Sequence, residues 1–360
     1  MSKKKICFIA QFPPPIHGLS KAVDTLYRSE LKNKFDFESI NITNNKIFLF
    51  NILSIIKSNA DLFYFTISQT KGGNLRDLII LKLLKLLKKK CLIHLHGGYY
   101  RTLVDQDLNN WQKKANYTAV KKLDGVIVLG NSLKKVFLGM IDESKIYTVP
   151  NCVDDEFVMD DRSFAKKQDQ LALRSIKHIL FLSNLIRTKG YRVVLELAKA
   201  EKMRCVAGAD KRYHFDFCGK FFSEDEKKFF YTYVRKNNLE DYISYHGVVI
   251  GDEKRKFLAM ADFFVLPTRY PNEGQPISII EAMANGLVII TTDHAGIPDL
   301  VRDGENGIVQ KEEEKLSIEM IDNIEINVIS KHNRNVALTY YTETNYIQNM
   351  GECFKEVTSR

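Results

Sequence analysis

The 360-residue chain lacks several features that would place it in a special class of protein. A membrane-spanning helix needs about 18 consecutive apolar residues, and the longest candidate, at 78–87, is interrupted by Lys82 and Lys85. The apolar stretch after the basic N-terminus is too short for a signal peptide. The six cysteines are scattered without a C-x-x-C pair, which favours neither a zinc site nor a disulfide framework. We therefore expect a protein of the reducing cytosol.

The net charge of +9 comes from one part of the chain. Residues 71–122 hold 12 Lys or Arg and 3 Asp or Glu, a surplus of 9, so the rest of the chain is balanced. Such a segment suits anionic lipid headgroups or nucleic acid. No aromatic residues are interleaved as in RNA-binding segments, so we expect it to face a membrane. A buried helix with a solvated lysine edge explains the pattern equally well.

Apolar strands alternate with helices along the whole chain, which predicts an α/β protein with doubly wound parallel sheets. The expected strands are 5–10, 61–67, 90–96, 124–130 and 145–150 in the first half, and 178–184, 212–219, 243–248, 262–268 and 286–292 in the second. We expect domains at 1–165 and 166–335, and a terminal helix within 336–360 that packs toward the first domain. Because open parallel sheets bind ligands at the carboxyl ends of their strands, a cleft between the domains is the expected site.

Residues 266–293 read as a strand, a loop containing glycine, a helix and a second strand. Pro276 suits the first turn of that helix, and Gly286 suits the position just past its last turn. The backbone N–H groups of Gly274, Gln275 and Ile277 would then point out of a helix N-terminus, where a phosphate is readily held. The segment therefore predicts an anion site.

Two carboxylates, Glu273 and Glu281, flank this loop and helix. Their spacing is not evidence, since Glu30 and Glu38 share it without any glycine, proline or apolar stripe between them. The helix that carries Glu281 has an apolar stripe on a different face, so both carboxylates can face one ligand. The alternative is one carboxylate that complements a helix dipole and one that is solvated.

The loop after the first strand contains one glycine before an apparent helix and no G-x-G-x-x-G, so no dinucleotide cofactor is expected. Gly18 and Leu19 can still place backbone amides near a ligand phosphate. A plain turn stiffened by Pro13–Pro15 is an equally good interpretation.

Several sequence blocks, taken together and in order, resemble the retaining, nucleotide-sugar-dependent glycosyltransferases of family 4, which have the two-domain GT-B fold. The blocks are FPPPIHGLS, HLHGG, YTVPNCVD, FLSNLIRTKGYRVVLEL, YHFDFCG, ISYHGVV, ADFFVLPT, EGQPISIIEAMANG and LVRDGENGIV. They cover nearly the whole chain. The resemblance implies two Rossmann-like domains that face each other across a cleft, the first for the acceptor and the second for the nucleotide-sugar donor.

The resemblance also implies roles for single residues. Glu273 would contact the donor sugar, and Glu281 would hydrogen-bond the ribose of the nucleotide. Lys189 would neutralise the leaving diphosphate, on which negative charge develops; an ordinary surface lysine is the alternative. The family often has an arginine five residues before this lysine, where this chain has Asn184. Whether Arg187 takes that role stays open.

His96 ends the expected strand at 90–96 and would contact the donor sugar, as a histidine does in the family. His94 lies two residues earlier on the same strand face, and we expect it to be packed. The residues that fall where family members line the nucleotide base are Gly219, His246, Gly247 and Val248.

No metal and no cofactor are expected, because cationic side chains and helix dipoles do the metal's work in GT-B enzymes. Asp105 and Asp107 form the D-x-D pattern that holds a metal in the other large glycosyltransferase fold. They lie away from the expected site, and we interpret them as part of a solvated turn.

The implied activity is transfer of a hexose, with retention, from a nucleoside diphosphate sugar, expected to be a UDP-sugar, to a hydroxyl of a glycan. The acceptor would be linked to a polyprenyl diphosphate, and the enzyme would act in capsule, O-antigen or exopolysaccharide synthesis. It would lie on the inner face of the cell membrane without binding nucleic acid. A sugar-nucleotide 2-epimerase of the same fold and a non-catalytic nucleotide- or glycan-binding protein are the alternatives. The sequence does not distinguish double displacement from same-face substitution.

Overall fold

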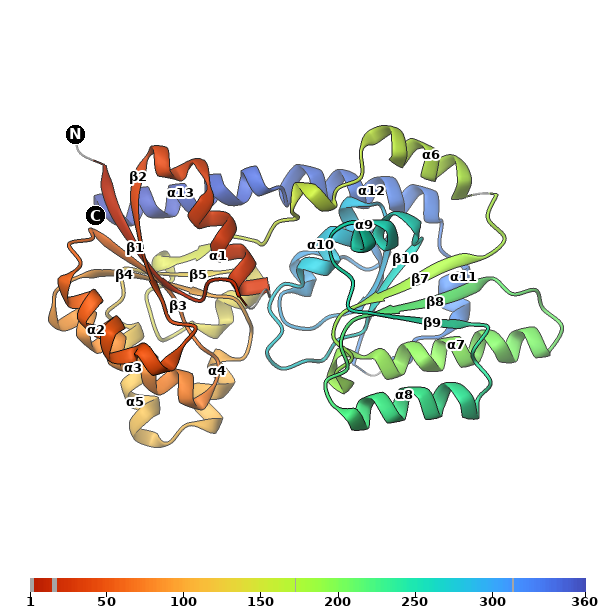
Figure 1. The fold of residues 1–360 in the computed structure, drawn as a ribbon, viewed down its shortest axis with the longest axis horizontal. Coiled ribbons are helices and arrows are strands. Elements are labelled where there is room, and N and C mark those ends of the chain that lie inside the picture. The colour runs from red at the N-terminus through yellow and green to blue at the C-terminus, as the bar shows by residue number, and fades with distance from the viewer. Residues whose placement is uncertain (1–2, 15–17, 172, 313) are drawn as a thin grey trace. The chain divides into compact units, whose positions relative to one another are not determined.

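The computed structural model describes residues 3–14, 18–171, 173–312 and 314–360 (Figure 1). These residues form two compact units. The N-terminal unit consists of Met1–Asn151, Asn272–Gln275 and Glu343–Arg360, and the C-terminal unit of Cys152–Pro271 and Pro276–Thr342.

The N-terminal unit is built on a parallel sheet with the strand order β2-β1-β3-β4-β5-β6. Its strands are β1 (Lys4–Ala10), β2 (Phe35–Asn41), β3 (Leu62–Thr66), β4 (Lys90–Leu95), β5 (Gly125–Val128) and β6 (Ile146–Thr148). Its α-helices are α1 (Gly18–Arg28), α2 (Phe48–Lys57), α3 (Lys71–Leu86), α4 (Tyr100–Thr102), α5 (Asn110–Val120) and α13 (Glu343–Ser359). Helices α2, α3 and α5 cover one face of the sheet, while α1 and α13 cover the other (Figure 1), as right-handed crossovers require.

The C-terminal unit is built on a second parallel sheet with the order β12-β11-β10-β7-β8-β9. Its strands are β7 (Lys177–Leu182), β8 (Tyr213–Cys218), β9 (Ile243–Gly247), β10 (Phe263–Leu266), β11 (Val288–Thr292) and β12 (Gly307–Gln310). Its α-helices are α6 (Asp161–Leu171), α7 (Tyr191–Val206), α8 (Glu224–Lys236), α9 (Gly251–Met260), α10 (Ile277–Ala284), α11 (Ile318–Asp322) and α12 (Ile326–Tyr340). The predicted α/β class with doubly wound parallel sheets is confirmed.

The units divide after Asn151, whereas the sequence pattern predicts a domain boundary at 165. Hydrogen bonds explain the position, because the segment after Asn151 is fixed to α10. The side chain of Asn285 donates to the carbonyl of Phe157 at 2.7 Å and accepts from the backbone N–H of Met159 at 3.0 Å. At the other end of the chain, Phe354 of α13 packs edge-on against Phe8 of β1, which ties this helix to the N-terminal sheet.

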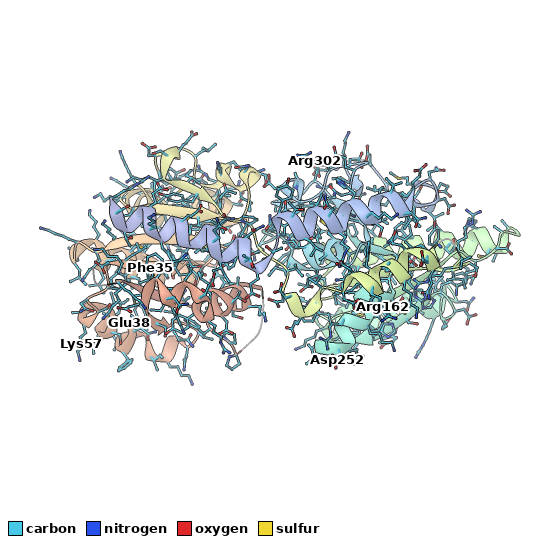
Figure 2. All side chains as sticks on the ribbon, turned by 90° about the horizontal axis from the view of Figure 1, so that it is seen from above. Phe35, Glu38, Lys57, Arg162, Asp252 and Arg302 are labelled. Carbon is cyan, nitrogen blue, oxygen red and sulfur yellow. The ribbon has the colours of Figure 1, made fainter. Side chains whose placement is uncertain are left out.

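Two strands, β2 and β12, were not predicted. β2 is an edge strand beside β1, and its polar residues Asp36, Ser39 and Asn41 are exposed, whereas Phe35 is buried and Glu38 is half-buried (both are labelled in Figure 2). β12 has four residues and follows directly on a polar, glycine-containing turn. Neither has the apolar run by which the other ten were recognised. Over the described ranges, no helix combines the length and the apolar character needed to cross a membrane.

Candidate functional site

In the N-terminal unit, the loop that carries Glu273 packs against the residues that follow β4. A Cβ on Gly274 would lie less than 3.0 Å from the carbonyl oxygen of His96, and a Cβ on Gly97 would lie 2.7 Å from the carbonyl oxygen of Asn272. Only glycine allows the two backbone segments to approach this closely. The structure therefore brings His96 and the Glu273 loop together, and the Glu273 residue is only 7% exposed.

His96 rests on a second histidine ring. The ring centroids of His94 and His96 are 3.9 Å apart. His94 is fully buried, as expected, and its Nδ1 lies 2.7 Å from the hydroxyl of Tyr64. Burial, and then the neighbouring His96, hold the pKa of His94 well below its usual range, so the supporting ring is neutral.

Gln275 is held by hydrogen bonds from Asn151, which lies shortly after the end of β6. Its Oε1 accepts a hydrogen bond from the backbone N–H of Asn151 at 2.7 Å, and its carbonyl oxygen accepts from Asn151 Nδ2 at 2.9 Å. In the part of the chain that the structure describes, Gln275 Nε2 and Asn151 Oδ1 are buried and have no hydrogen-bond partner. Buried polar atoms of this kind normally meet a partner. Asn151 was not singled out in the sequence, although it follows Pro150 in one of the quoted blocks.

Residues 15–17 of the loop before α1 lie outside the described ranges. Gly18 and Leu19 are the first two residues of α1. Their backbone amides thus belong to a helix N-terminus, as the phosphate interpretation requires.

In the C-terminal unit, Lys189 is positioned by a close backbone contact. Gly190 has φ +86°, and a Cβ there would overlap the carbonyl group of Pro267, so glycine is required on both grounds. The backbone N–H of Arg269 donates to the carbonyl of Thr188 at 2.7 Å. These contacts hold Lys189 beside the segment that follows β10, with its Nζ 5.0 Å from the ring centroid of Tyr270. Tyr270 was not singled out in the sequence.

Asn184, where the family often has an arginine, and Arg187 are both exposed. Asn184 accepts a hydrogen bond from the backbone N–H of Lys220 at 3.4 Å. Arg187 begins the short 3₁₀ turn Arg187–Lys189. Arg187 therefore shares this turn with Lys189, and Asn184 precedes it.

Helix α10 begins one residue later than its sequence predicts and ends where it predicts. Pro276 is the residue immediately before the helix, Ile277 is its first residue, and Gly286 follows its end with φ +70°. In the second turn, Glu281 is 3% exposed, and its Oε1 lies 2.6 Å from the Nζ of Lys254 on α9. Burial raises the pKa of Glu281, and Lys254 opposes that rise. The ion-pair partner has no motif signal and was missed.

Two buried cations stabilise the C-terminal end of α10. Arg334 donates to the carbonyl oxygen of Ala284 at 2.8 Å, and Lys167 donates to that of Asn285 at 3.0 Å. Both satisfy carbonyl groups that the helix end leaves without intrahelical partners, and the guanidinium of Arg334 also offsets the partial negative charge there. The helix that carries Glu281 is thus fixed at its end by residues of α12 and α6.

Because Lys167 is buried, its titration should make the stability of the protein depend on pH. Burial lowers the pKa of Lys167 to about 7, whereas an unfolded lysine titrates near 10.4. The charged form therefore costs free energy in the folded state below pH 7, and the cost falls as the pH rises toward 10. Relative to Lys167→Met, we expect the free energy of unfolding of the wild type to increase by about 2 kcal/mol from about pH 6 to about pH 9. Urea denaturation of both proteins at both pH values measures the two free energies of unfolding. If their difference does not change with pH, the pKa of Lys167 is not lowered in the folded state.

The four residues expected near the nucleotide base lie at the carboxyl ends of β8 and β9. The backbone N–H of Gly219 donates to the carbonyl of Gly247 at 2.6 Å, and Val248 is 62% exposed. His246 Nε2 lies 2.8 Å from Asp216 Oδ1. Burial would raise the pKa of Asp216, but contacts with His178 and His246 outweigh it and lower that pKa. Asp216 thereby fixes the ring orientation of His246 and was also missed.

The D-x-D pattern is not a solvated turn, and that prediction is wrong. Residues Leu103–Asp107 form a π-helical turn. Asp105 lies 3.1 Å from Lys113 Nζ, and Asp107 accepts a hydrogen bond from the hydroxyl of Tyr99 at 2.8 Å. Among the described residues, no three or more His, Cys, Asp or Glu side chains are grouped so that they could hold a metal ion.

Comparison with known proteins shows similarity to glycosyltransferases. Residues 163–340 match the family model described as "Glycosyl transferases group 1". Over 133 residues the chain is 32% identical to the putative colanic acid biosynthesis glycosyltransferase WcaL of Salmonella typhimurium. The aligned residues make up 36% of this chain and 31% of that protein. Over 140 residues it is 29% identical to the amylovoran biosynthesis glycosyltransferase AmsK of Erwinia amylovora, covering 38% and 32%. The match thus spans about a third of the length of these curated relatives.

Among solved structures, Anabaena HepE in complex with UDP superposes with a TM-score of 0.75 at 13% identity, covering 98% of this chain and 100% of that chain. At this identity the similarity establishes the fold alone. The chain therefore has the fold of the GT-B glycosyltransferases, and its residues 163–340 are similar to the family of glycosyl transferases group 1.

Proposed function

We propose that the protein is a retaining, metal-independent hexosyltransferase of family 4 that uses a UDP-sugar and takes part in the synthesis of a bacterial surface polysaccharide. The observation that carries the proposal is the buried Glu273 loop held against His96 by two glycine contacts. The names of the relatives, which refer to colanic acid and amylovoran biosynthesis, support the polysaccharide. The UDP in the HepE structure supports the nucleotide.

In this proposal the site residues have separate roles. Glu273 and His96 bind hydroxyls of the donor sugar. Glu281 binds the ribose, and Lys189 neutralises the diphosphate as the bond from the anomeric carbon to the phosphate oxygen breaks. The acceptor oxygen attacks from the same face, and its proton passes to the leaving phosphate, which accounts for retention without a carboxylate nucleophile.

The remaining donor contacts in the proposal are made by residues near strand and helix ends. Backbone amides of Gly18, Leu19, Gly274, Gln275 and Ile277 hold the phosphates, with Pro276 fixing the start of α10 and Arg187 as a second cation. The base lies against Gly219, His246, Gly247 and Val248. The chain needs no cofactor beyond the donor.

The acceptor in this proposal is a glycan on a polyprenyl diphosphate, and the enzyme works at the inner face of the cell membrane. The support is the surplus of positive charge within 71–122, the segment that contains α3 and α5. Such a surface attracts anionic lipids.

The first experiment is a thermal-shift screen of nucleoside diphosphates and their sugars, followed by calorimetry on Glu281→Ala. A nucleotide at 100 times its dissociation constant adds roughly 2.7 kcal/mol of stability, so the right base is readily detected. We expect Glu281→Ala to weaken nucleotide binding about tenfold or more, because it removes a charge-assisted hydrogen bond. Unchanged affinity would contradict the ribose role. Interconversion of the free UDP-sugar without transfer would identify an epimerase instead.

A further inference from the structure

An apolar groove of about 890 Å³ lies between α3 and α5 in the N-terminal unit. Leucines of α3, including Leu78 and Leu81, line one wall, and the small residues Ala115 and Ala119 of α5 leave room on the other. The two helices are joined by a buried pair of amides: Asn74 and Asn116 donate to each other at 2.8 and 3.1 Å. The groove is therefore a fixed feature of the unit, and its volume is that of a ligand site.

Positive charge surrounds this apolar surface. Seven lysines line the groove, five of them within residues 82–90 and two, Lys114 and Lys122, on the α5 side. Asp124 is the one acidic residue among the described residues that line it, and its carboxylate accepts a hydrogen bond from the backbone N–H of Cys91 at 2.8 Å. The groove thus offers an excess of cations to a ligand.

Two of these lysines meet. The side chain of Lys85 on α3 contacts that of Lys122, which follows α5, and this contact lowers the pKa of Lys85. Neighbouring ammonium groups repel each other. An anion between them would remove the repulsion and would bind to both walls of the groove.

The surroundings of the groove are apolar as well as cationic. Leu75, Ile79 and Trp111 line it and are exposed, Trp111 to 65%. Helix α2 belongs to the same helical layer (Figure 1) and exposes Phe50 to 67%. Its other exposed apolar residues are Leu49, Leu53 and Ile56, and Lys57 ends the helix (Figure 2). Exposed apolar side chains interleaved with lysines are typical of surfaces that lie in the headgroup region of a bilayer.

We propose that the groove between α3 and α5 binds an acidic membrane lipid, with one hydrocarbon chain along the apolar floor and the phosphate between Lys85 and Lys122. A water-soluble polyanion would satisfy the lysines but leave the leucines and Trp111 in water. A neutral lipid would cover the apolar floor and leave the lysines repelling each other. The inference rests on the membrane association in the proposed function and gives it a specific ligand site.

Trp111 provides a direct reporter because it is the only tryptophan of the chain and lines the groove. The full chain is mixed with vesicles of phosphatidylcholine alone, or with phosphatidylglycerol added whose acyl chains are brominated. We expect the brominated acidic lipid to quench Trp111 and to float with the protein. Inorganic phosphate and single-stranded RNA serve as anions without a chain and should leave the emission unchanged.

Two groove variants separate the headgroup from the chain. Lys85→Glu/Lys122→Glu should reduce partition into the acidic vesicles at least about 10-fold, since each cation near such a surface contributes measurably. Ala119→Phe keeps every charge but fills the groove, so quenching should fall while flotation is retained in part. The matched control is Lys228→Glu/Lys236→Glu on α8, an exposed pair that gives the same net charge; it should bind like the wild type.

The site is overturned if Trp111 is not quenched, if both double variants lose binding equally, or if RNA shifts the emission as the lipid does. None of these measurements uses a donor or an acceptor. Transfer to a soluble glycan with no quenching would refute the lipid site and leave the transferase standing. Quenching without any transfer would support the lipid site and count against the transferase activity.

Discussion

Replacing Glu273 by glutamine is expected to lower the rate of sugar transfer at least about 100-fold, the effect seen when one preorganised group that stabilises a transition state is removed. Glutamine has the same shape, so the loop should stay in place against His96 through Gly274. In the proposed mechanism the carboxylate binds sugar hydroxyls that become more acidic as positive charge develops on the ring. Its loss should therefore lower the turnover number and leave nucleotide affinity unchanged.

The measurement is initial rates of transfer at saturating donor, together with calorimetric affinity for the nucleotide. Glu305→Gln is a matched control, because Glu305 is exposed and pairs with Arg302 at the surface at 3.5 Å. Wild-type turnover in Glu273→Gln would rule out the assignment. Loss of nucleotide binding together with turnover would instead mean that the substitution disturbs the loop.

Ten strands and the α10 helix could be predicted because their signals are local. Each strand that was recognised has an apolar run, and α10 has Pro276 and Gly286 at its two ends. The edge strands β2 and β12 lack such runs, because a strand that pairs on one side can be polar or short. An apolar or aromatic run is what makes a strand visible in sequence, and the edge strands β6 and β9 were recognised because they have one.

The candidate site was visible only in part, for a related reason. His96 and Glu273 lie within recognisable blocks, but the contact between them is made by two glycines far apart in the chain, Gly97 and Gly274. Lys254 has no motif, since a lysine on an amphipathic helix is normally solvated. Its pairing with Glu281 depends on how α9 packs beside α10, which no local pattern specifies.

Replacing Lys254 by methionine is expected to destabilise the protein by about 3–5 kcal/mol, because it leaves the buried carboxylate of Glu281 without its cation. The pair is 2.6 Å apart, and the Glu281 side chain is 4% exposed. Methionine fills a similar volume, so the loss would be electrostatic. Urea denaturation of the full chain at neutral pH measures the change.

The pH dependence and a second substitution identify the cause. Burial already raises the pKa of Glu281, and removing Lys254 should raise it further. An unfolded glutamate ionises near pH 4.3, so the folded variant must either bind a proton or bury a charge above that pH. The destabilisation should therefore be small at about pH 4 and grow as the pH rises through the raised pKa. In Lys254→Met/Glu281→Gln most of the loss should be recovered, because no buried charge remains. A loss that is equal at all pH values, and that the second substitution does not reduce, would mean that Lys254 stabilises the fold through its contact with the Phe157 ring, 4.0 Å away, rather than through the carboxylate.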